Sequence, residues 1–90
     1  KSNRITNLFP NPFNPKLTIR FELNDNQIAE IYIHNILGKL VFTTGKKDYT
    51  PGKHSLDWNV SSNKNIGSGI FFVTLNTLNQ SITKKVLYIK

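Results

Sequence analysis

Three prolines fall within six residues, at Pro10, Pro12 and Pro15, and this cluster limits the possible folds more than any other feature of the chain. A proline has no backbone N–H, fixes its own φ near about −65° and disfavours helical geometry in the residue before it. Neither a helix nor a central β-strand tolerates three prolines at that spacing. We therefore expect residues 10–15 to form a stiff, extended crossing, with Phe13 packed inward as an apolar plug.

The segment that follows the prolines has the pattern of a half-buried strand. Apolar and polar residues alternate without a fault over residues 17–23. Successive side chains of a strand point to opposite faces, so this period of two places one set in the core and the other in solvent. The inward set is expected to be Leu17, Ile19, Phe21 and Leu23.

Short apolar runs separated by turn residues continue to the end of the chain. Residues 35–38 are expected to close a hairpin with Gly38 at positive φ, and residues 45–52 and 61–69 to form polar loops. With no run of helical period, the pattern predicts an all-β fold, an antiparallel seven-stranded β-sandwich of immunoglobulin or fibronectin III-like shape. The seven expected strands are residues 4–9, 17–23, 28–34, 39–44, 54–58, 70–75 and 82–89.

The length of 90 residues limits the chain to one small domain. Cysteine is absent, which excludes a disulfide scaffold, a thiolate zinc site and a cysteine nucleophile together. No apolar run approaches the roughly 18 residues that cross a bilayer. Because the chain begins with Lys1 and has no signal-peptide pattern, we interpret it as a piece of a longer protein.

The charge is strongly positive: 12 Lys and Arg stand against 5 Asp and Glu, for a formal net charge of +7. A basic domain can bind nucleic acid, anionic lipid or a polyanionic glycan. The basic residues are scattered, however, with adjacent pairs only at 46–47 and 84–85, and no aromatic RNA-binding signature accompanies them. Solubility is the simpler interpretation, and we predict no nucleic-acid partner.

Side chains that could carry chemistry are few. His34 and His54 are the only histidines, and a metal site needs further convergent ligands. Asp57 follows His54 by three residues, which places it on the opposite face of a strand. No serine lies in a nucleophile-elbow pattern, and the five acids form neither a glycosidase pair nor an EF-hand loop. We predict no enzymatic activity, no metal and no cofactor.

The aromatic residues of two strands have a structural interpretation and a binding one. An exposed Trp58 would suggest a sugar or peptide platform, but its alternation with Leu56 predicts that it fills the core. Phe71 and Phe72 are adjacent and must point to opposite faces, so one is expected in the core and the other outside. If that strand were uncovered, it could pair edge-on with another chain.

Five motifs, in order, resemble one known family. The Pro-Asn-Pro-Phe-Asn-Pro of residues 10–15, followed by the alternation of residues 18–23, resembles the opening of the type A C-terminal sorting domains of the type IX secretion system. The hairpin at 33–41, the Gly-x-His-x-x-x-Trp strand at 52–58, the Ser-Gly-Ile-Phe at 68–71 and the basic strand at 83–90 are similar to its later motifs. His34 stands where that family usually has Tyr, and Phe71 where Tyr is commoner. The similarity covers about residues 7–90.

The resemblance implies a non-catalytic C-terminal secretion signal. Such a domain directs its cargo protein across the outer membrane of Bacteroidetes and related bacteria through the type IX secretion system, and is then usually cleaved. The implied partners are an outer-membrane β-barrel shuttle, a sortase-like peptidase and an upstream cargo domain in the same chain. The implied location is the periplasm in transit, then the cell surface or the extracellular space.

The resemblance also implies domain boundaries and contact residues. Residues 1–6 would be a linker or a first-strand lead-in from the cargo, and residues 7–90 the sorting β-sandwich. Residues implied to bind the secretion machinery are Pro10, Asn11, Pro12, Phe13, Asn14, Pro15, Gly69, Phe71, Lys84, Lys85, Val86, Leu87 and Lys90.

A different assignment starts from the same opening motif. Immunoglobulin-like domains of flagellar hook-capping proteins have a related Pro-Asn-Pro-Phe opening, and some accessory modules of secreted glycoside hydrolases look similar. The alternative function is therefore a structural module, or one that binds a glycan or a protein. The end of the sequence at Lys90, directly after a strand, is expected for a sorting signal rather than for a hook-capping domain.

Overall fold

The computed structural model describes residues 3–62 and 65–90. Over those residues the chain forms eight β-strands and one short 3-10 helix, Val60–Ser62. The strands are β1 (Arg4–Phe9), β2 (Lys16–Leu23), β3 (Gln27–Asn35), β4 (Leu40–Thr43), β5 (Lys47–Tyr49), β6 (Gly52–Asn59), β7 (Gly69–Thr77) and β8 (Ser81–Tyr88).

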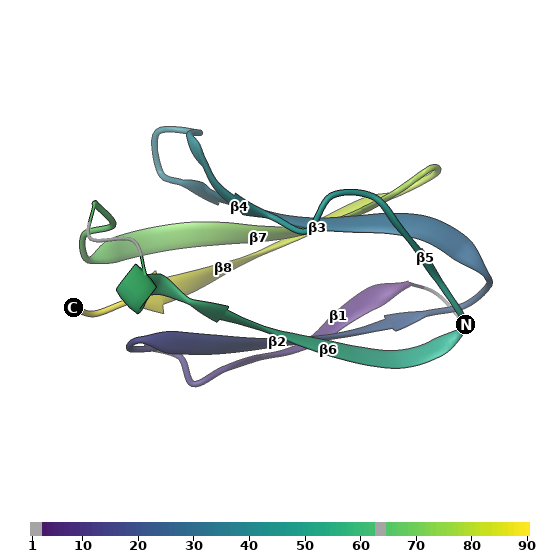
Figure 1. Ribbon diagram of the computed structural model, residues 1–90, viewed down its shortest axis with the longest axis horizontal. Coiled ribbons are helices and arrows are strands. Elements are labelled where there is room, and N and C mark those ends of the chain that lie inside the picture. Colours follow the sequence, from purple (N-terminus) through teal and green to yellow (C-terminus); the bar gives the residue numbers. More distant parts are fainter. Residues whose placement is uncertain (1–2, 63–64) are drawn as a thin grey trace.

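The strands form two antiparallel sheets. One sheet has the order β1-β2-β6, and the other has the order β4-β3-β7-β8, with β5 also paired to β3. Figure 1 shows them as two layers, with β1, β2 and β6 below and β3, β4, β7 and β8 above. The prediction of an all-β fold with antiparallel sheets is confirmed.

The predicted strand number was wrong, because β5 lies inside the segment expected to be a polar loop. β4 pairs only with the C-terminal part of β3, from Tyr32 to His34. β5 pairs with its N-terminal part, where Asp48 lies opposite Ile28. The second short strand supplies partners for backbone groups of β3 that β4 does not reach. Two of its three residues are charged, so no apolar alternation marks it in the sequence.

The space between the two sheets is filled by the alternating residues. The four residues of β2 expected to face inward, Leu17, Ile19, Phe21 and Leu23, are all buried, and so are Trp58 of β6 and Phe71 of β7. Phe72 points to the outer face and is half-buried, as its position next to Phe71 requires. The buried hydrophobic core is Ile5, Phe13, Leu17, Ile19, Phe21, Leu23, Ala29, Ile31, Ile33, Trp58, Val60, Ile66, Phe71, Val73, Leu75, Val86 and Tyr88.

The hairpin between β3 and β4 forms where the sequence predicts it. Gly38 has a φ of 83°, which is the left-handed region that favours glycine. The side-chain oxygen of Asn35 accepts hydrogen bonds from the backbone N–H groups of Leu37 and Lys39, both at 2.9 Å. The Asn35 side chain thus takes the place of a backbone carbonyl as hydrogen-bond acceptor inside the turn.

The Pro-rich segment is less regular than the sequence predicts. Residues 10–15 are not uniformly extended: they bend on both sides of Phe13, which alone forms a β-bridge. The boundary predicted at residues 1–6 stays a prediction: β1 begins at Arg4, and residues 1–2 lie outside the described residues, as do residues 63–64 of the loop expected at 61–69. In the part of the chain that the structure describes, no helix has the length and apolarity needed to span a membrane.

Candidate functional site

The Pro-rich segment, residues 10–15, which we call the strap, lies against the end of β8. The backbone N–H of Phe13 donates to the carbonyl oxygen of Leu87 at 2.9 Å, and the N–H of Ile89 donates to the carbonyl oxygen of Phe13 at 3.2 Å. Phe13 and Tyr88 form a parallel β-bridge. One residue of the strap therefore extends the five-stranded sheet beyond its edge strand.

Two asparagine side chains add to the backbone hydrogen bonds between the strap and the end of β8. The side-chain oxygen of Asn11 accepts the N–H of Leu87 at 3.1 Å, and the side-chain N–H of Asn14 donates to the carbonyl oxygen of Ile89 at 2.7 Å. The prolines beside them have no N–H to offer. The alternation of Asn with Pro therefore keeps the last residues of the chain hydrogen-bonded although half of the strap consists of proline.

The side chain of Phe13 anchors the strap in the core. It is 1% exposed, and its ring lies 5.1 Å from Tyr88 and 5.7 Å from Trp58 between centroids. Phe71 closes the group, with centroids 5.8 Å from Trp58 and 6.4 Å from Tyr88. Tilted and edge-on aromatic contacts at these separations are favourable beyond the burial of their area. The predicted apolar plug is confirmed.

We call residues 87–90 the tail. The strand β7 flanks it on the side opposite the strap. Gly69 lies opposite Tyr88 in the ladder, and Phe71 lies opposite Val86. Gly69 has a φ of 154°, a conformation that side-chain-bearing residues rarely adopt. The backbone N–H of Lys90 donates to the hydroxyl of Ser68 at 2.8 Å. The three segments singled out in the sequence thus meet at one end of the molecule.

Burial divides the singled-out residues into two groups. Phe13, Phe71 and Val86 are buried in the core, so they hold the site together and have no free surface. Gly69 is intermediate. The exposed members are Pro10, Asn11, Pro12, Asn14, Pro15, Lys84, Lys85, Leu87 and Lys90.

One side of β8 remains open along its first half. Because Leu87 directs both its N–H and its C=O to the strap, alternation along the strand directs the backbone of Thr83 and Lys85 to the same side. Among the described residues no strand pairs with β8 there, although β1 approaches it. Lys84 shares the inward face of Val86 yet is exposed at this edge. A charged residue pointing inward on an edge strand disfavours pairing with another chain.

The residues that could carry acid–base chemistry are dispersed. His34 lies on β3, where its ring packs edge-on against Tyr32, and His54 lies on β6, where its Nε2 is 2.7 Å from the carbonyl oxygen of Thr50. Asp57 faces the other side of the sheet from His54 and accepts a hydrogen bond from Thr18, as its spacing predicts. Over residues 3–62 and 65–90, no three His, Asp or Glu side chains are grouped to hold a metal ion.

Sequence reasoning missed a second polar structure, at the opposite end of the molecule. There Asn3 is buried, with its amide bonded to residues at the β2–β3 and β7–β8 connections. A concavity of about 930 Å³ lies beside it, lined largely by amide side chains. The only sequence signal is the abundance of Asn and Gln near turns, which by itself indicates ordinary loop chemistry.

Comparison with known protein families gives one match. The family model described as "Secretion system C-terminal sorting domain" matches residues 7–90. The search of curated proteins returned no match to this chain.

Proposed function

The chain belongs to the secretion system C-terminal sorting domains and is a C-terminal secretion signal of the type IX system, and we propose that it acts by presenting the strap and the tail to that machinery as one composite surface. The family's role is secretion rather than catalysis, and it implies export across the outer membrane to the cell surface or the extracellular space. The mutual hydrogen bonds of strap and tail support a surface that exists only in the folded domain.

The fold that carries this surface is proposed to be an immunoglobulin-like β-sandwich of the fibronectin III kind. With β5 set aside, the strands group as first, second and fifth against fourth, third, sixth and seventh. That is the A-B-E and C′-C-F-G arrangement, a variant of the immunoglobulin grouping in which one strand has changed sheets. The single core between the two layers supports the same assignment.

The contact residues are proposed to be the exposed members of the singled-out set. The strap presents Pro10, Asn11 and Pro12 to solvent, and β8 presents Lys85 and Leu87. A rigid backbone with fixed φ angles loses little conformational entropy when it docks on a partner. The partner in this proposal is an outer-membrane β-barrel shuttle, which receives the domain in the periplasm.

The remaining parts of the proposal concern processing. A sortase-like peptidase separates the domain from an upstream cargo domain after export, and residues 1–6 are the lead-in through which the two are joined. The domain itself performs no catalysis and binds no nucleic acid. The dispersal of His34, His54 and Asp57 over separate faces supports the absence of an active site of its own.

An export assay tests the composite surface. The domain is fused behind a periplasmic reporter in a type IX-competent host, and surface reporter is measured. The double variant Asn11→Ala/Asn14→Ala removes two hydrogen bonds that tie strap to tail, and export is expected to fall at least about tenfold, since each such bond contributes about 1 kcal/mol. Leu78→Ala is the matched control, because Leu78 is 93% exposed on the turn at the far end of β8.

Deletion of the last five residues gives the decisive result. Loss of residues 86–90 removes the tail and the bridge to Phe13, so the reporter is expected to stay in the periplasm. Equal surface display with and without these residues would refute the proposal. Circular dichroism of each purified variant verifies that the sheets persist.

A further inference from the structure

Apolar side chains gather on the surface at one end of the five-stranded sheet. The turn between β3 and β4 exposes Ile36 and Leu37, by 69% and 89%, and β4 begins with the exposed Leu40. Ile70 of β7 and Leu87 of β8 are exposed beside them. We call these five residues the apolar patch. A single exposed apolar residue needs no explanation, but a group of them marks contact with a protein or a membrane.

The strand register makes the apolar patch continuous. Phe72 of β7 points outward and lies opposite Lys85 of β8. Ile70 and Leu87 also lie opposite each other, two residues nearer the end of the sheet, so strand alternation puts them on the same outer face. Ile36 of the turn and Phe72 line one shallow hollow on that face. The patch therefore extends from the turn across β7 to β8.

The apolar patch carries positive charge. Lys39 is exposed in the turn, and Lys85 is exposed on the sheet face. None of the five acidic residues of the chain falls in residues 31–47 or 58–90, the segments that supply the patch. Among the described residues, neither lysine forms an ion pair. Apolar side chains and cations together suit a partner that is both apolar and anionic.

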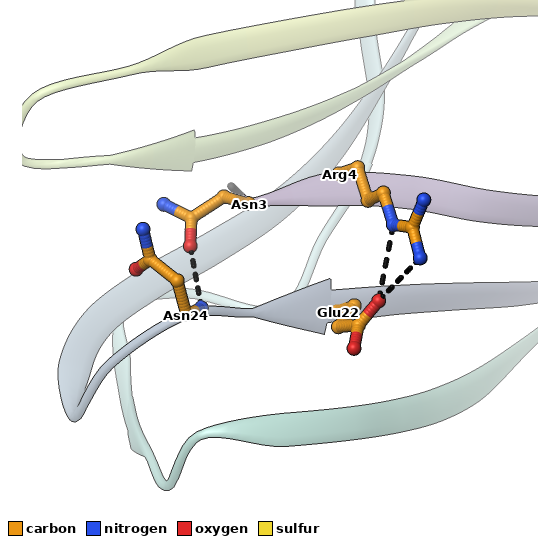
Figure 2. A network of polar contacts seen from close by, with 4 residues as sticks. All are labelled: Asn3, Arg4, Glu22 and Asn24. Carbon is orange, nitrogen blue, oxygen red and sulfur yellow. Dashed lines mark hydrogen bonds and ion pairs between the residues drawn. The ribbon is translucent and has the colours of Figure 1, made fainter. Parts of the chain in front are cut away.

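The opposite end of the domain has an exposed leucine in different surroundings. Leu78, in the turn between β7 and β8, is 93% exposed. The concavity beside it is lined by two acids, one lysine and several amide side chains. At this end Asn3 and Arg4 bond to Asn24 and Glu22 (Figure 2). Leu78 therefore matches Leu37 in residue type and exposure, and differs from it in its neighbours.

The shape of the turn favours a lipid surface over a protein partner. Figure 1 shows the turn between β3 and β4 at the upper left, where it extends beyond the two layers of strands. A protein partner needs a hollow that matches so convex a contact, whereas the interface of a bilayer accommodates apolar side chains of any outline. Binding to such an interface grows with the apolar area buried and with the attraction of lysines to anionic lipid.

We propose that the turn at residues 36–40 and the adjoining face of β7 and β8 dock on the surface of an anionic phospholipid bilayer. The apolar side chains of the turn enter the zone between headgroups and acyl chains, and the ammonium groups of Lys39 and Lys85 contact lipid phosphates. The turn lies outside the strap and the tail, so this docking needs no protein of the secretion machinery.

Flotation with lipid vesicles measures the docking. The purified chain is mixed at low salt with vesicles of phosphatidylglycerol and phosphatidylcholine in equal parts, or of phosphatidylcholine alone. The parent chain is expected to float with the anionic vesicles and to bind the neutral ones at least about fivefold more weakly, because lysines near the surface are attracted to anionic lipid.

Leucine variants at the two ends locate the contact. Leu37→Ala is expected to weaken binding to the anionic vesicles about tenfold, because most of the apolar area that residue 37 buries in the interface is lost. Leu78→Ala removes the same side chain at the opposite end and should leave binding unchanged. Circular dichroism verifies that both variants keep their sheets.

Variants of Lys39 isolate the contribution of charge. Lys39→Ala is expected to weaken binding to the anionic vesicles about fivefold, and Lys39→Arg, which keeps the charge, should bind as the parent does. The difference should shrink as salt is added, because salt screens the attraction. Neither change should affect binding to the neutral vesicles.

A fluorescent label shows which end enters the lipid. The chain has no cysteine, so Leu37→Cys and Leu78→Cys each provide one site for a dye whose emission shifts to the blue in apolar surroundings. Anionic vesicles are expected to shift the emission of the dye at position 37 and not at position 78. A shift at position 78 alone would overturn the proposal.

The other outcomes are equally decisive. A parent chain that does not float with anionic vesicles overturns the proposal, and so does equal binding by Leu37→Ala and Leu78→Ala. If sedimentation without lipid shows a dimer for the parent and a monomer for Leu37→Ala, the apolar patch joins two copies and the proposal is wrong. The vesicles contain no secretion protein, so flotation together with a failed export assay would refute only the proposed function.

Discussion

The two ends of the domain attach their terminal segments by opposite means. At the strap end, backbone groups of Phe13, Leu87 and Ile89 bond to one another over a buried aromatic group. At the Asn3 end, side-chain amides bond to one another and to a turn, and no ring contact reinforces them among the described residues of that cluster. The attachment of the tail thus combines hydrogen bonds with the apolar burial of Phe13, whereas the contacts of Asn3 are polar.

The difference predicts unequal strength. Removing a buried aromatic ring costs about 3–5 kcal/mol, whereas losing a set of hydrogen bonds around one amide costs about 1–3 kcal/mol. A domain of this size has only about 5–15 kcal/mol of total stability. The strap end is therefore expected to open last and the Asn3 end first, and four measurements test this order.

Phe13→Ala is expected to have the largest effect. It leaves a cavity beside Trp58 and Tyr88 and should lower the free energy of unfolding by about 3–5 kcal/mol. Urea unfolding followed by the fluorescence of Trp58, the sole tryptophan, measures the change. Phe9→Ala is the control: Phe9 is 39% exposed and should cost about 1 kcal/mol or less, including its contact with Arg20. A loss below about 1 kcal/mol for Phe13→Ala would contradict the apolar account of the strap.

Asn3→Ala is expected to come second. The lost amide should reduce stability by about 1–3 kcal/mol in the same urea assay, and Asn7→Ala by no more than about 0.5 kcal/mol. Hydrogen exchange should show the loss concentrated at the first residues of β1. If Asn3→Ala proved more destabilising than Phe13→Ala, the order of the two ends would be reversed.

Asn11→Ala is expected to have a smaller and more local effect. The N–H of Leu87 loses its acceptor, so its exchange with solvent deuterium should accelerate about fivefold, for a hydrogen bond of about 1 kcal/mol. The N–H of Ile89, which donates to the backbone of Phe13, should change less. Equal exchange of Leu87 in both chains would show that Asn11 does not hold the tail.

Tyr49 of β5 gives the smallest effect and concerns the Asn3 end, where it pairs with Gln27. Burial raises the pKa of its hydroxyl above the ordinary value of 10.0. The folded state therefore keeps the proton to higher pH than the unfolded state, and stability from this group is full below about pH 10 and is lost as pH rises through the folded pKa. Tyr49→Phe should flatten the decline of stability above pH 10 and leave stability at pH 7 nearly unchanged. An unaltered alkaline decline would contradict this assignment.

The sequence predicted the structural features that depend on local patterns, such as the alternation of apolar and polar residues along a strand. The inward residues of β2, the plug formed by Phe13, the hairpin at Gly38 and the core position of Trp58 follow from spacing alone, because each is fixed by strand period or by turn chemistry within a few residues. The motifs of the strap, of Gly69–Phe71 and of β8 were singled out by the resemblance to a known family. Their convergence is a property of the topology.

What could not be predicted depends on residues far apart in the chain. β5 has no apolar alternation, and it forms because β3 extends beyond the reach of β4. The partners of Asn3 lie 21, 24 and 77 positions away, so only the folded sheets bring them together. The bends of the strap escaped prediction because they follow from its docking on β8, whereas the prolines fix only their own φ angles and bias the residues before them.

The start of β1 and the end of β8 lie toward opposite ends of the longest dimension of the domain, which measures 36 Å (Figure 1). Anything joined ahead of Asn3 therefore sits on the far side from the tail, with the body of the two sheets between them. A large attached protein and a small one would both leave the strap and the tail exposed. If the strap and the tail form the docking surface, as proposed above, we expect the same domain to serve attached proteins of different sizes.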